Sequence, residues 1–286
     1  MILAETRGQL EASLEDWSAA GERIALVPTM GNLHEGHLRL VGEAQALASR
    51  VVVSIFVNPL QFGPQEDFAS YPRTLQADRE LLQAQGADLL FAPPVEQVYP
   101  QGQQGHTQVE VPDISAQLCG ASRPGHFSGV ATVVCKLLNL VRPQLALFGE
   151  KDYQQLLVIR RMVADLALPV QIIGVPTVRE ADGLALSSRN RYLSTEQRQQ
   201  APRLYRTLCW LAEGLKAGAG DFALLEQEAC ARLSQAGFQP DYVSIRRSQD
   251  LAPAGPQDHS LRLLAAAQLG QARLIDNLGL VLTAES

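Results

Sequence analysis

The segment Pro28–His37, with the sequence PTMGNLHEGH, constrains this chain more than any other stretch. It follows an apolar run, Ile24–Val27, that is typical of a buried strand. The residues after it are apolar at helical spacing: Leu38, Leu40, Val41, Ala44 and Leu47. The pattern therefore predicts a strand, a short turn and a helix, with His34 and His37 on one face of the first helical turn.

The start of a helix is a favourable place for an anion, because free backbone N–H groups and the helix dipole point toward it. Gly36 has no Cβ, so a ligand can approach the backbone closely there. Imidazoles donate hydrogen bonds to phosphate oxygens, and a protonated one adds positive charge. The segment is thus suited to a nucleotide whose α-phosphate is attacked, which favours nucleotidyl transfer.

Two other interpretations of the histidine pair stay open from the residues alone. The pair is compatible with a fragment of a metal site, although no nearby cysteine or acidic residue is placed to complete one. It is also compatible with the ordinary polarity of a helix start, with one histidine buried. The surrounding order of strand, glycine, histidine, glycine, histidine and helix favours phosphate binding.

Short apolar runs alternate with helical patterns over roughly the first 175 residues. The predicted strands are Ile24–Val27, Val51–Val57, Asp88–Ala92, Leu145–Phe148 and Val170–Val175. The predicted helices between them lie around Leu38–Ala48, Leu75–Gln85, Gly129–Leu140 and Tyr153–Leu166. Continuously apolar strands separated by helices predict a parallel sheet that is covered on both faces, and such sheets bind ligands beyond the carboxyl ends of their strands.

The pattern changes after Val178. Two helical segments, Glu196–Ala217 and Phe222–Ala236, are followed by a short strand at Tyr242–Ile245 and a hairpin. The hairpin runs from Leu261–Leu269 to Ala272–Asp276. We therefore predict an α/β protein with a Rossmann-like parallel-sheet domain at residues 1–177 and a smaller α+β domain at residues 178–286.

Composition narrows the class of function. The chain has 286 residues, 46% of them hydrophobic and 19% charged, which is ordinary for a soluble globular enzyme. The formal net charge is −6 without a basic run, and this argues against nucleic acid as a partner. No apolar run reaches the length of a membrane span and no leader pattern opens the chain, so we expect a cytoplasmic protein. The four cysteines show no CxxC pairing, which indicates neither a zinc site nor a disulfide framework.

Two further polar segments follow predicted strands or precede predicted helices. Asn58–Gly63 comes after the second strand, and its Asn and Gln side chains suit hydroxyl and carboxylate groups. Arg123–Gly129 precedes a helix and offers a second loop for an anion. Taken alone, the first segment is more typical of an Asn-Pro turn, and the second is equally typical of a Gly/Pro turn with an exposed arginine.

Phe148–Gln155 and Asp182–Asn190 also carry groups suited to phosphate chemistry. The first places Lys151 and Asp152 where a strand ends, although Asp152 with Gln155 would also make a helix cap. The second is a polar loop with two hydroxyls and Arg189, whose guanidinium can pair with the oxygens of a triphosphate or of leaving pyrophosphate. By itself such a loop is more often structural.

Taken together and in order, these segments resemble the pantothenate synthetase (pantoate–β-alanine ligase) family, within the HIGH-motif nucleotidyltransferase superfamily. The resemblance runs nearly from end to end of the chain. It is carried by Pro28–His37, Phe56–Gly63, Tyr71–Thr74, Arg123–Gly129, Phe148–Gln155, Leu184–Leu193 and Arg273–Asn277. One departure is Cys119, at a position where many relatives carry an acidic residue.

The resemblance implies ATP-dependent condensation of (R)-pantoate with β-alanine through a pantoyl adenylate, with release of AMP and pyrophosphate. It also implies Mg²⁺, whose ligands the sequence leaves open, and a homodimer. It places ATP at Met30, Gly31, Asn32, Leu33, His34, Glu35, Gly36, His37, Gly149, Glu150, Lys151, Asp152, Val178, Leu186, Ser187, Ser188 and Arg189. It places pantoate at Gln61 and Gln155, with β-alanine also near Gln61.

The resemblance and the chemistry together suggest catalytic roles for His34, His37, Lys151 and Arg189. A carboxylate that attacks a phosphate meets like charge, so positioning and positive electrostatics should carry most of the catalysis. Two alternatives stay open: another HIGH-type nucleotidyltransferase that stops after nucleotidyl transfer, and a nucleotide-sensing protein on the same fold.

Overall fold

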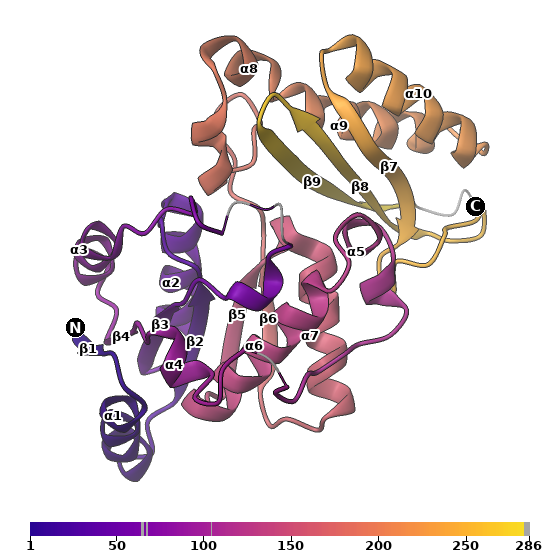
Figure 1. Cartoon of the computed structure of the whole chain (residues 1–286). Coiled ribbons are helices and arrows are strands. Elements are labelled where there is room, and N and C mark those ends of the chain that lie inside the picture. Colours follow the sequence, from indigo (N-terminus) through magenta and orange to yellow (C-terminus); the bar gives the residue numbers. More distant parts are fainter. Residues whose placement is uncertain (64–65, 67, 104, 283–286) are drawn as a thin grey trace. The chain divides into compact units, whose positions relative to one another are not determined.

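The computed structural model describes residues 1–63, 66, 68–103 and 105–282, and it divides into two compact units (Figure 1). The first unit comprises Met1–Glu150 and Gln155–Pro176, and the second comprises Lys151–Gln154 and Thr177–Ser286. The sequence placed Lys151–Gln154 and Thr177 in the first domain, whereas the structure groups these residues with the second unit. The last four residues of the second predicted domain lie outside the described part of the chain.

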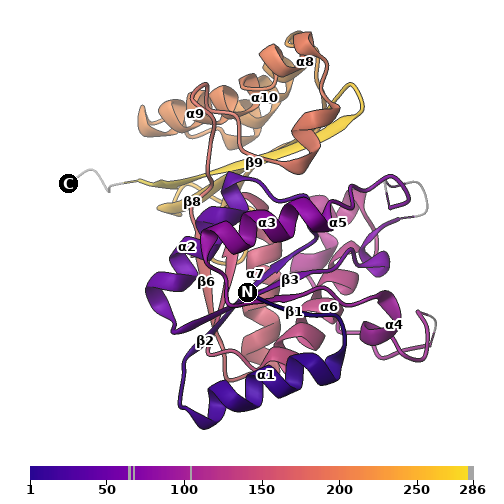
Figure 2. The same ribbon diagram turned by 90° about the vertical axis from the view of Figure 1, so that its left-hand side faces the viewer.

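The first unit contains a six-stranded sheet in the order β1-β4-β3-β2-β5-β6, in which every neighbouring pair is parallel. Figure 2 views this unit from the side of β1, the strand at one edge. The strands are β1 (Ile2–Ala4), β2 (Ile24–Thr29), β3 (Arg50–Ile55), β4 (Leu89–Phe91), β5 (Leu145–Gly149) and β6 (Gln171–Val175). The predicted parallel α/β sheet is therefore confirmed, with β1 as an additional strand.

The longer helices of the first unit are α1 (Arg7–Ala19), α2 (Glu35–Leu47), α3 (Leu75–Gln85), α6 (His126–Val141) and α7 (Tyr153–Asp165). Its short helical segments are η1 (Pro59–Gln61), α4 (Val95–Val98), η2 (Ile114–Ala116), α5 (Cys119–Ser122) and η3 (Glu150–Asp152). Helix α2 contacts α3, and α1 contacts α6.

The continuously apolar strands bury side chains on both faces of the sheet. One face packs Ala25, Val27 and Leu147 against α2 and α3 in a single hydrophobic cluster. The alternate residues, such as Leu26 and Ala146, are also fully buried. Burial of each leucine or valine contributes about 1.5–3 kcal/mol, so these runs favour a sheet that is covered on both sides.

The order of the strands identifies the ligand-binding edge of the first unit. The chain moves from β2 to β3 and β4 on one side of β2, whereas β5 and β6 lie on its other side. The connections therefore diverge between β2 and β5. In open parallel sheets, ligands bind outside the carboxyl ends of the strands at such a switch point.

The second unit contains a three-stranded antiparallel sheet in the order β7-β8-β9, and α9 and α10 pack against it (Figure 1). Its elements are η4 (Ser188–Tyr192), α8 (Thr195–Gln200), α9 (Arg203–Lys216), α10 (Phe222–Gln235), β7 (Gln239–Arg247), β8 (Ser260–Leu269) and β9 (Ala272–Val281). The predicted segment Glu196–Ala217 is divided between α8 and α9. The division falls at Pro202, because proline has no N–H to continue the helical hydrogen bonds. Among the described helices, none combines the length and the apolar character that a membrane crossing requires.

Candidate active site

His34 and His37 cap the start of α2 reciprocally. His34 is the N-cap residue in an extended conformation, and its Nδ1 accepts a hydrogen bond from the Gly36 N–H at 3.2 Å. Nδ1 of His37 accepts from the His34 N–H at 3.3 Å, and the two ring centroids are 4.1 Å apart. Both histidines therefore lie at the first turn of α2, which is the N-terminal end of the helix, where an anion is favoured.

This capping geometry determines the tautomer of both rings. A ring nitrogen that accepts an N–H carries no proton, so Nδ1 is unprotonated in His34 and in His37. A neutral imidazole then carries its proton on Nε2. Both rings thus act as neutral Nε2–H donors in this geometry, which suits hydrogen bonding to phosphate oxygens rather than proton donation by an imidazolium.

The turn between β2 and α2 is held by Asp78, which the sequence analysis missed. Asp78 lies on α3 and is 1% exposed. Its carboxylate accepts hydrogen bonds from the Asn32 N–H at 2.9 Å and the Leu33 N–H at 2.8 Å. Gly31 has φ +81°, and a Cβ there would lie 3.0 Å from the same carboxylate. The sequence did contain a signal for this role. Asp78 stands four residues before Leu82, so an acidic residue lies on the buried face of an amphipathic helix.

Replacing Asp78 with alanine is expected to lower the free energy of unfolding by about 2–4 kcal/mol, because it removes the carboxylate that two partly buried N–H groups share. Urea denaturation measures this loss. Asp165→Ala is the matched control: Asp165 pairs with Arg161 on the surface of α7, and such pairs contribute below about 1 kcal/mol. Equal stability of the two variants would show that Asp78 does not hold the turn.

Gln61 follows β3 and is almost completely buried at 8% exposure. Its Nε2 donates to Sδ of Met30 at 2.8 Å. The structure therefore brings together two residues that the sequence assigned to different ligands, Met30 to ATP and Gln61 to pantoate.

The backbone of Gln61 is fixed by the segment that precedes α6. His126 Nδ1 donates to the Gln61 carbonyl at 2.8 Å, and Arg123 Nη2 lies 3.3 Å from the same oxygen. A Cβ on Gly129 would lie 2.3 Å from the carbonyl oxygen of Leu60, so only glycine permits this close approach of η1 to α6.

The guanidinium of Arg123 binds protein groups rather than forming an open anion loop. Its Nε and Nη2 donate to the carboxylate of Glu66 at 2.7 and 2.5 Å, and the arginine side chain is 18% exposed. Burial alone would raise the pKa of Glu66, but the hydrogen bonds and charge of Arg123 outweigh it and lower that pKa. Of the two interpretations of Arg123–Gly129, the structure favours a structural turn, with the arginine paired rather than exposed.

The segment after β5 is divided between the two units. Gly149, Glu150 and Gln155 belong to the first unit, whereas Lys151 and Asp152 belong to the second. The carbonyl of Lys151 accepts a hydrogen bond from Nδ2 of Asn277, on β9, at 2.8 Å. The Lys151 side chain is 19% exposed and its Nζ lies 3.9 Å from Oδ1 of Asp152, whose side chain is 47% exposed.

In the second unit, the base of the Val178–Arg189 loop is firmly anchored. The Leu186 N–H donates to the Val178 carbonyl at 3.0 Å, which joins two residues predicted to bind ATP. Arg179 donates to both carboxylate oxygens of the buried Asp276, at 2.6 and 2.8 Å. Ser187 then caps η4 by accepting from the Arg189 N–H at 3.3 Å. The loop thus presents Ser187, Ser188 and Arg189 at the start of η4 from a rigid base.

Within the first unit, the predicted residues lie beyond the carboxyl ends of three neighbouring strands. Met30–His37 follow β2, Gln61 follows β3, and Gly149 ends β5, with Glu150 directly after it and Gln155 at the start of α7. These strands surround the switch point between β2 and β5. The remaining predicted residues, Lys151, Asp152, Val178 and Leu186–Arg189, belong to the second unit.

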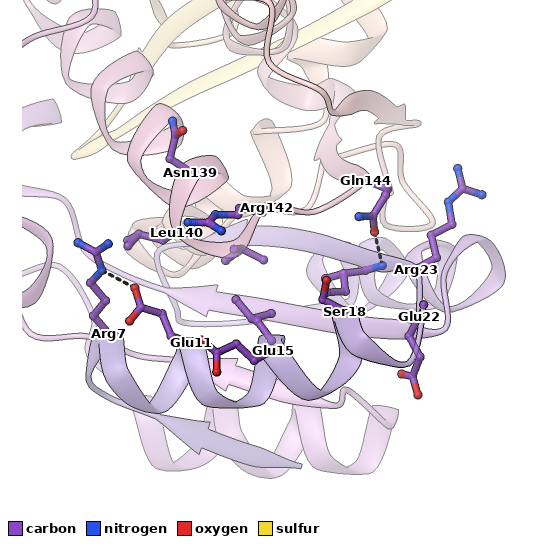
Figure 3. Close-up of a pocket in the computed structure, with 14 residues that line it drawn as sticks. Arg7, Glu11, Glu15, Ser18, Glu22, Arg23, Asn139, Leu140, Arg142 and Gln144 are labelled. Atoms are coloured by element: carbon purple, nitrogen blue, oxygen red, sulfur yellow. Dashed lines mark hydrogen bonds and ion pairs between the residues drawn. The ribbon is translucent and has the colours of Figure 1, made fainter.

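A cavity of about 700 Å³ lies at the opposite edge of the sheet, between α1, the end of α6 and the start of β2 (Figure 3). There the Ile24 N–H donates to Oε1 of Gln144, and the Gln144 N–H donates to the Ile24 carbonyl. Arg7 forms an ion pair with Glu11 at 2.7 Å. The arginine and glutamate side chains that line the cavity balance in charge, and none of the lining residues is a predicted site residue. The chemistry therefore points to the carboxyl edge rather than to this cavity.

Comparison with known proteins decides the family. A model described as pantoate–β-alanine ligase matches residues 2–279 of this chain. The chain belongs to this family. The match confirms the resemblance drawn from the motifs, and it covers both units, so the second unit is a regular part of pantoate–β-alanine ligases.

Individual relatives agree with the family assignment. The chain is 62% identical over 277 residues to a pantothenate synthetase of Methylococcus capsulatus, and the aligned region covers 97% of each chain. It is similar to a pantothenate synthetase structure from Thermus thermophilus, with a TM-score of 0.91, 51% identity and coverage of 97% and 99%. A pantoate–β-alanine ligase structure from Francisella tularensis, described as complexed with beta-gamma ATP and β-alanine, matches with a TM-score of 0.82, 35% identity and 97% coverage of each chain. The predicted fold class and enzyme class are confirmed by these relatives.

Proposed function

We propose that this protein condenses pantoate with β-alanine in two steps through a pantoyl adenylate, and that only the first step consumes ATP. The observation that carries the proposal is the match to the ligase family over residues 2–279, with every motif of the predicted site present. The Francisella tularensis relative, described as complexed with beta-gamma ATP and β-alanine, supports the choice of co-substrates.

In the first step, a carboxylate oxygen of pantoate attacks the α-phosphorus of ATP, and the bond to pyrophosphate breaks. Two negatively charged groups must approach each other, so hydrogen-bond donors and cations are the groups that lower the barrier. The Nε2–H groups of His34 and His37 are suited to bind phosphate oxygens, and the tautomer fixed by the cap keeps them as donors. Lys151 and Arg189 would offset the charge on the phosphates and on leaving pyrophosphate.

In the second step, the neutral amine of β-alanine attacks the acyl carbon of the adenylate. A C–N bond forms, the bond from the acyl carbon to the phosphate oxygen breaks, and AMP leaves. The amine nitrogen loses a proton as the amide forms. Binding and orientation of the two reactants should carry much of this step, because the mixed anhydride is already an activated acyl group.

Magnesium fits the residues that this site offers. Mg²⁺ prefers oxygen ligands and commonly rests on one or two carboxylates together with substrate phosphates and water. Within the described residues there is no cluster of three or more histidine, cysteine or acidic side chains arranged for a metal. The half-exposed carboxylate of Asp152 is available as a ligand beside phosphates, and the ion would supply charge neutralisation there.

We assign pantoate binding to Gln61 and Gln155, which follow β3 and β5. Neutral amides can orient the hydroxyls and the carboxylate of pantoate without forming a salt bridge that would weaken the carboxylate as a nucleophile. We further propose that the enzyme is cytoplasmic and forms a homodimer; analytical ultracentrifugation of the purified chain tests the second point.

Replacing Gln61 or Gln155 with alanine is expected to raise the KM for pantoate and lower kcat/KM about tenfold to a hundredfold, because an unpaired polar group on the substrate costs roughly 1–3 kcal/mol. ATP affinity, measured by calorimetry without pantoate, should remain nearly unchanged. Gln76→Ala, on the exposed side of α3, is the control. Loss of ATP affinity with an unchanged pantoate KM would move these glutamines to the nucleotide site.

Product analysis tests the proposed reaction directly. The protein is mixed with ATP, Mg²⁺, pantoate and β-alanine, and the products are separated by mass spectrometry. We expect AMP, pyrophosphate and an amide of pantoate with β-alanine. A stable nucleotidyl-linked product without an amide would instead indicate a HIGH-type nucleotidyltransferase that stops after the first step.

A further inference from the structure

Tyr99 begins a buried chain of hydrogen bonds that ends on Gln61. Its hydroxyl lies 2.9 Å from Oδ1 of Asn58, and Nδ2 of Asn58 lies 3.3 Å from Oε1 of Gln61. Tyr99 is 3% exposed, Asn58 is 1% exposed and Gln61 is 8% exposed. The side chains come from two separate parts of the first unit, since Tyr99 follows α4 whereas Asn58 caps η1 and Gln61 is the last residue of η1.

The hydrogen bonds in this series all run in one direction, from Tyr99 through Asn58 to Gln61. Oδ1 of Asn58 accepts from the Tyr99 hydroxyl and from the Leu60 N–H at 3.3 Å, which assigns that end of the amide as the oxygen. Nδ2 of Asn58 therefore faces Gln61, and it also donates to the Gly129 carbonyl at 3.0 Å. Oε1 of Gln61 must then be the acceptor, which leaves Nε2 as the end that lies against Met30.

The hydroxyl of Tyr99 is a permanent donor. Burial raises the pKa of Tyr99 well above its usual value, so the hydroxyl keeps its proton throughout the range in which the enzyme would work. The ring itself is held by other contacts, with the centroid of His106 at 5.1 Å and Nζ of Lys136 at 5.3 Å. A change of tyrosine to phenylalanine therefore removes the donor while leaving the ring its neighbours.

We propose that Tyr99 is a positioning residue for pantoate: through Asn58 it holds the Gln61 amide with Nε2 toward the substrate, so that Gln61 donates to an oxygen of pantoate. The inference rests on the proposed contact between Gln61 and pantoate. Pantoate offers carboxylate and hydroxyl oxygens as acceptors. A reversed amide would present Oε1 to those oxygens and repel a carboxylate.

Tyr99→Phe is expected to raise the KM for pantoate about 3- to 10-fold, the size of one lost hydrogen bond, with the KM for ATP unchanged. Tyr242→Phe, on β7 of the second unit, is the matched control and should change neither constant. The urea midpoint of each variant shows whether a change in KM accompanies a loss of stability. A KM for ATP that rises together with that for pantoate would indicate general disturbance and overturn the proposal.

A double-mutant cycle with Gln61→Ala separates the positioning role from the proposed substrate contact. If Tyr99 acts through Gln61, adding Tyr99→Phe to Gln61→Ala should leave the pantoate KM unchanged. An equal rise in both backgrounds overturns the positioning role alone. If Gln61→Ala itself leaves the pantoate KM unchanged, the assignment of Gln61 in the proposed function is overturned instead.

Gln61→Glu tests which end of the amide faces the substrate. Glutamate keeps an oxygen to accept from Asn58 and places a second oxygen where Nε2 stands. We expect a pantoate KM higher than that of Gln61→Ala, because two carboxylates would then approach each other. A KM lower than that of Gln61→Ala would show that Oε1 faces pantoate, and it would overturn the orientation that Tyr99 is proposed to set.

Discussion

His37→Ala is expected to slow adenylate formation by about 10²–10³, the usual cost of losing a donor matched to charge that develops in a transition state. The expectation rests on the Nε2–H of His37, which the cap leaves as a donor at the start of α2. Pre-steady-state measurement of AMP transfer to pantoate, without β-alanine, isolates this step from amide formation.

The alanine variant also removes the hydrogen bond that Nδ1 of His37 accepts from the His34 N–H. His37→Asn is the matched control, since its side-chain oxygen can take the place of Nδ1 in the cap while nothing replaces Nε2. We expect His37→Asn to recover stability but to remain slow. Recovery of the rate in His37→Asn would mean that the cap, rather than the donor, matters for catalysis.

Lys151→Ala is expected to slow the same step to a similar extent, because the ammonium of Lys151 is a cation held in a partly buried position after β5. Lys151→Met retains most of the side-chain volume and removes only the charge, so it should be equally slow. Near-normal adenylate formation in both Lys151 variants, with an intact circular dichroism spectrum, would contradict the assigned role.

Arg189→Ala is expected to slow the ATP-dependent first step about a hundredfold while sparing attack of β-alanine on purified pantoyl adenylate. A guanidinium pairs with phosphate oxygens in a planar fork, and pyrophosphate leaves only in the first step. Ser187 fixes the backbone of Arg189 at the start of η4, so the side chain begins from a defined position.

Arg191→Ala is the matched control for Arg189, because it removes the same charge two residues along the same short helix. Its guanidinium lies 5.4 Å from the ring centroid of Tyr192. We expect this variant to retain both half-reactions. Equal loss of both half-reactions in Arg189→Ala would contradict a role confined to pyrophosphate.

Much of the fold could be predicted because its signals are local. Runs such as Val51–Val57 and Leu145–Phe148 are apolar on both faces, and they form β3 and β5. β1 was missed because three residues are too few to show a pattern. Helix α1 was missed because its apolar residues are sparse, and only Leu10, Leu14 and Trp17 are buried.

The parts of the site that could not be predicted depend on contacts between distant residues. Asp78 binds the turn at Asn32 across 46 residues, and Tyr99 reaches Asn58 across 41. Lys151 is held by Asn277 from the far end of the chain, which explains why a segment that follows β5 groups with the second unit. No local pattern reveals such pairs, whereas the histidine and glycine spacing of Met30–His37 is written in consecutive residues.

The transfer of labelled oxygen from pantoate tests the central claim most directly. Pantoate with ¹⁸O in its carboxylate is incubated with the protein, ATP, Mg²⁺ and β-alanine, and the AMP is analysed by mass spectrometry. A pantoyl adenylate joins a carboxylate oxygen to the α-phosphorus, and that oxygen leaves with AMP when the amide forms. We predict one ¹⁸O atom in each AMP. Unlabelled AMP, formed together with the amide, would show that pantoate is not activated as an adenylate.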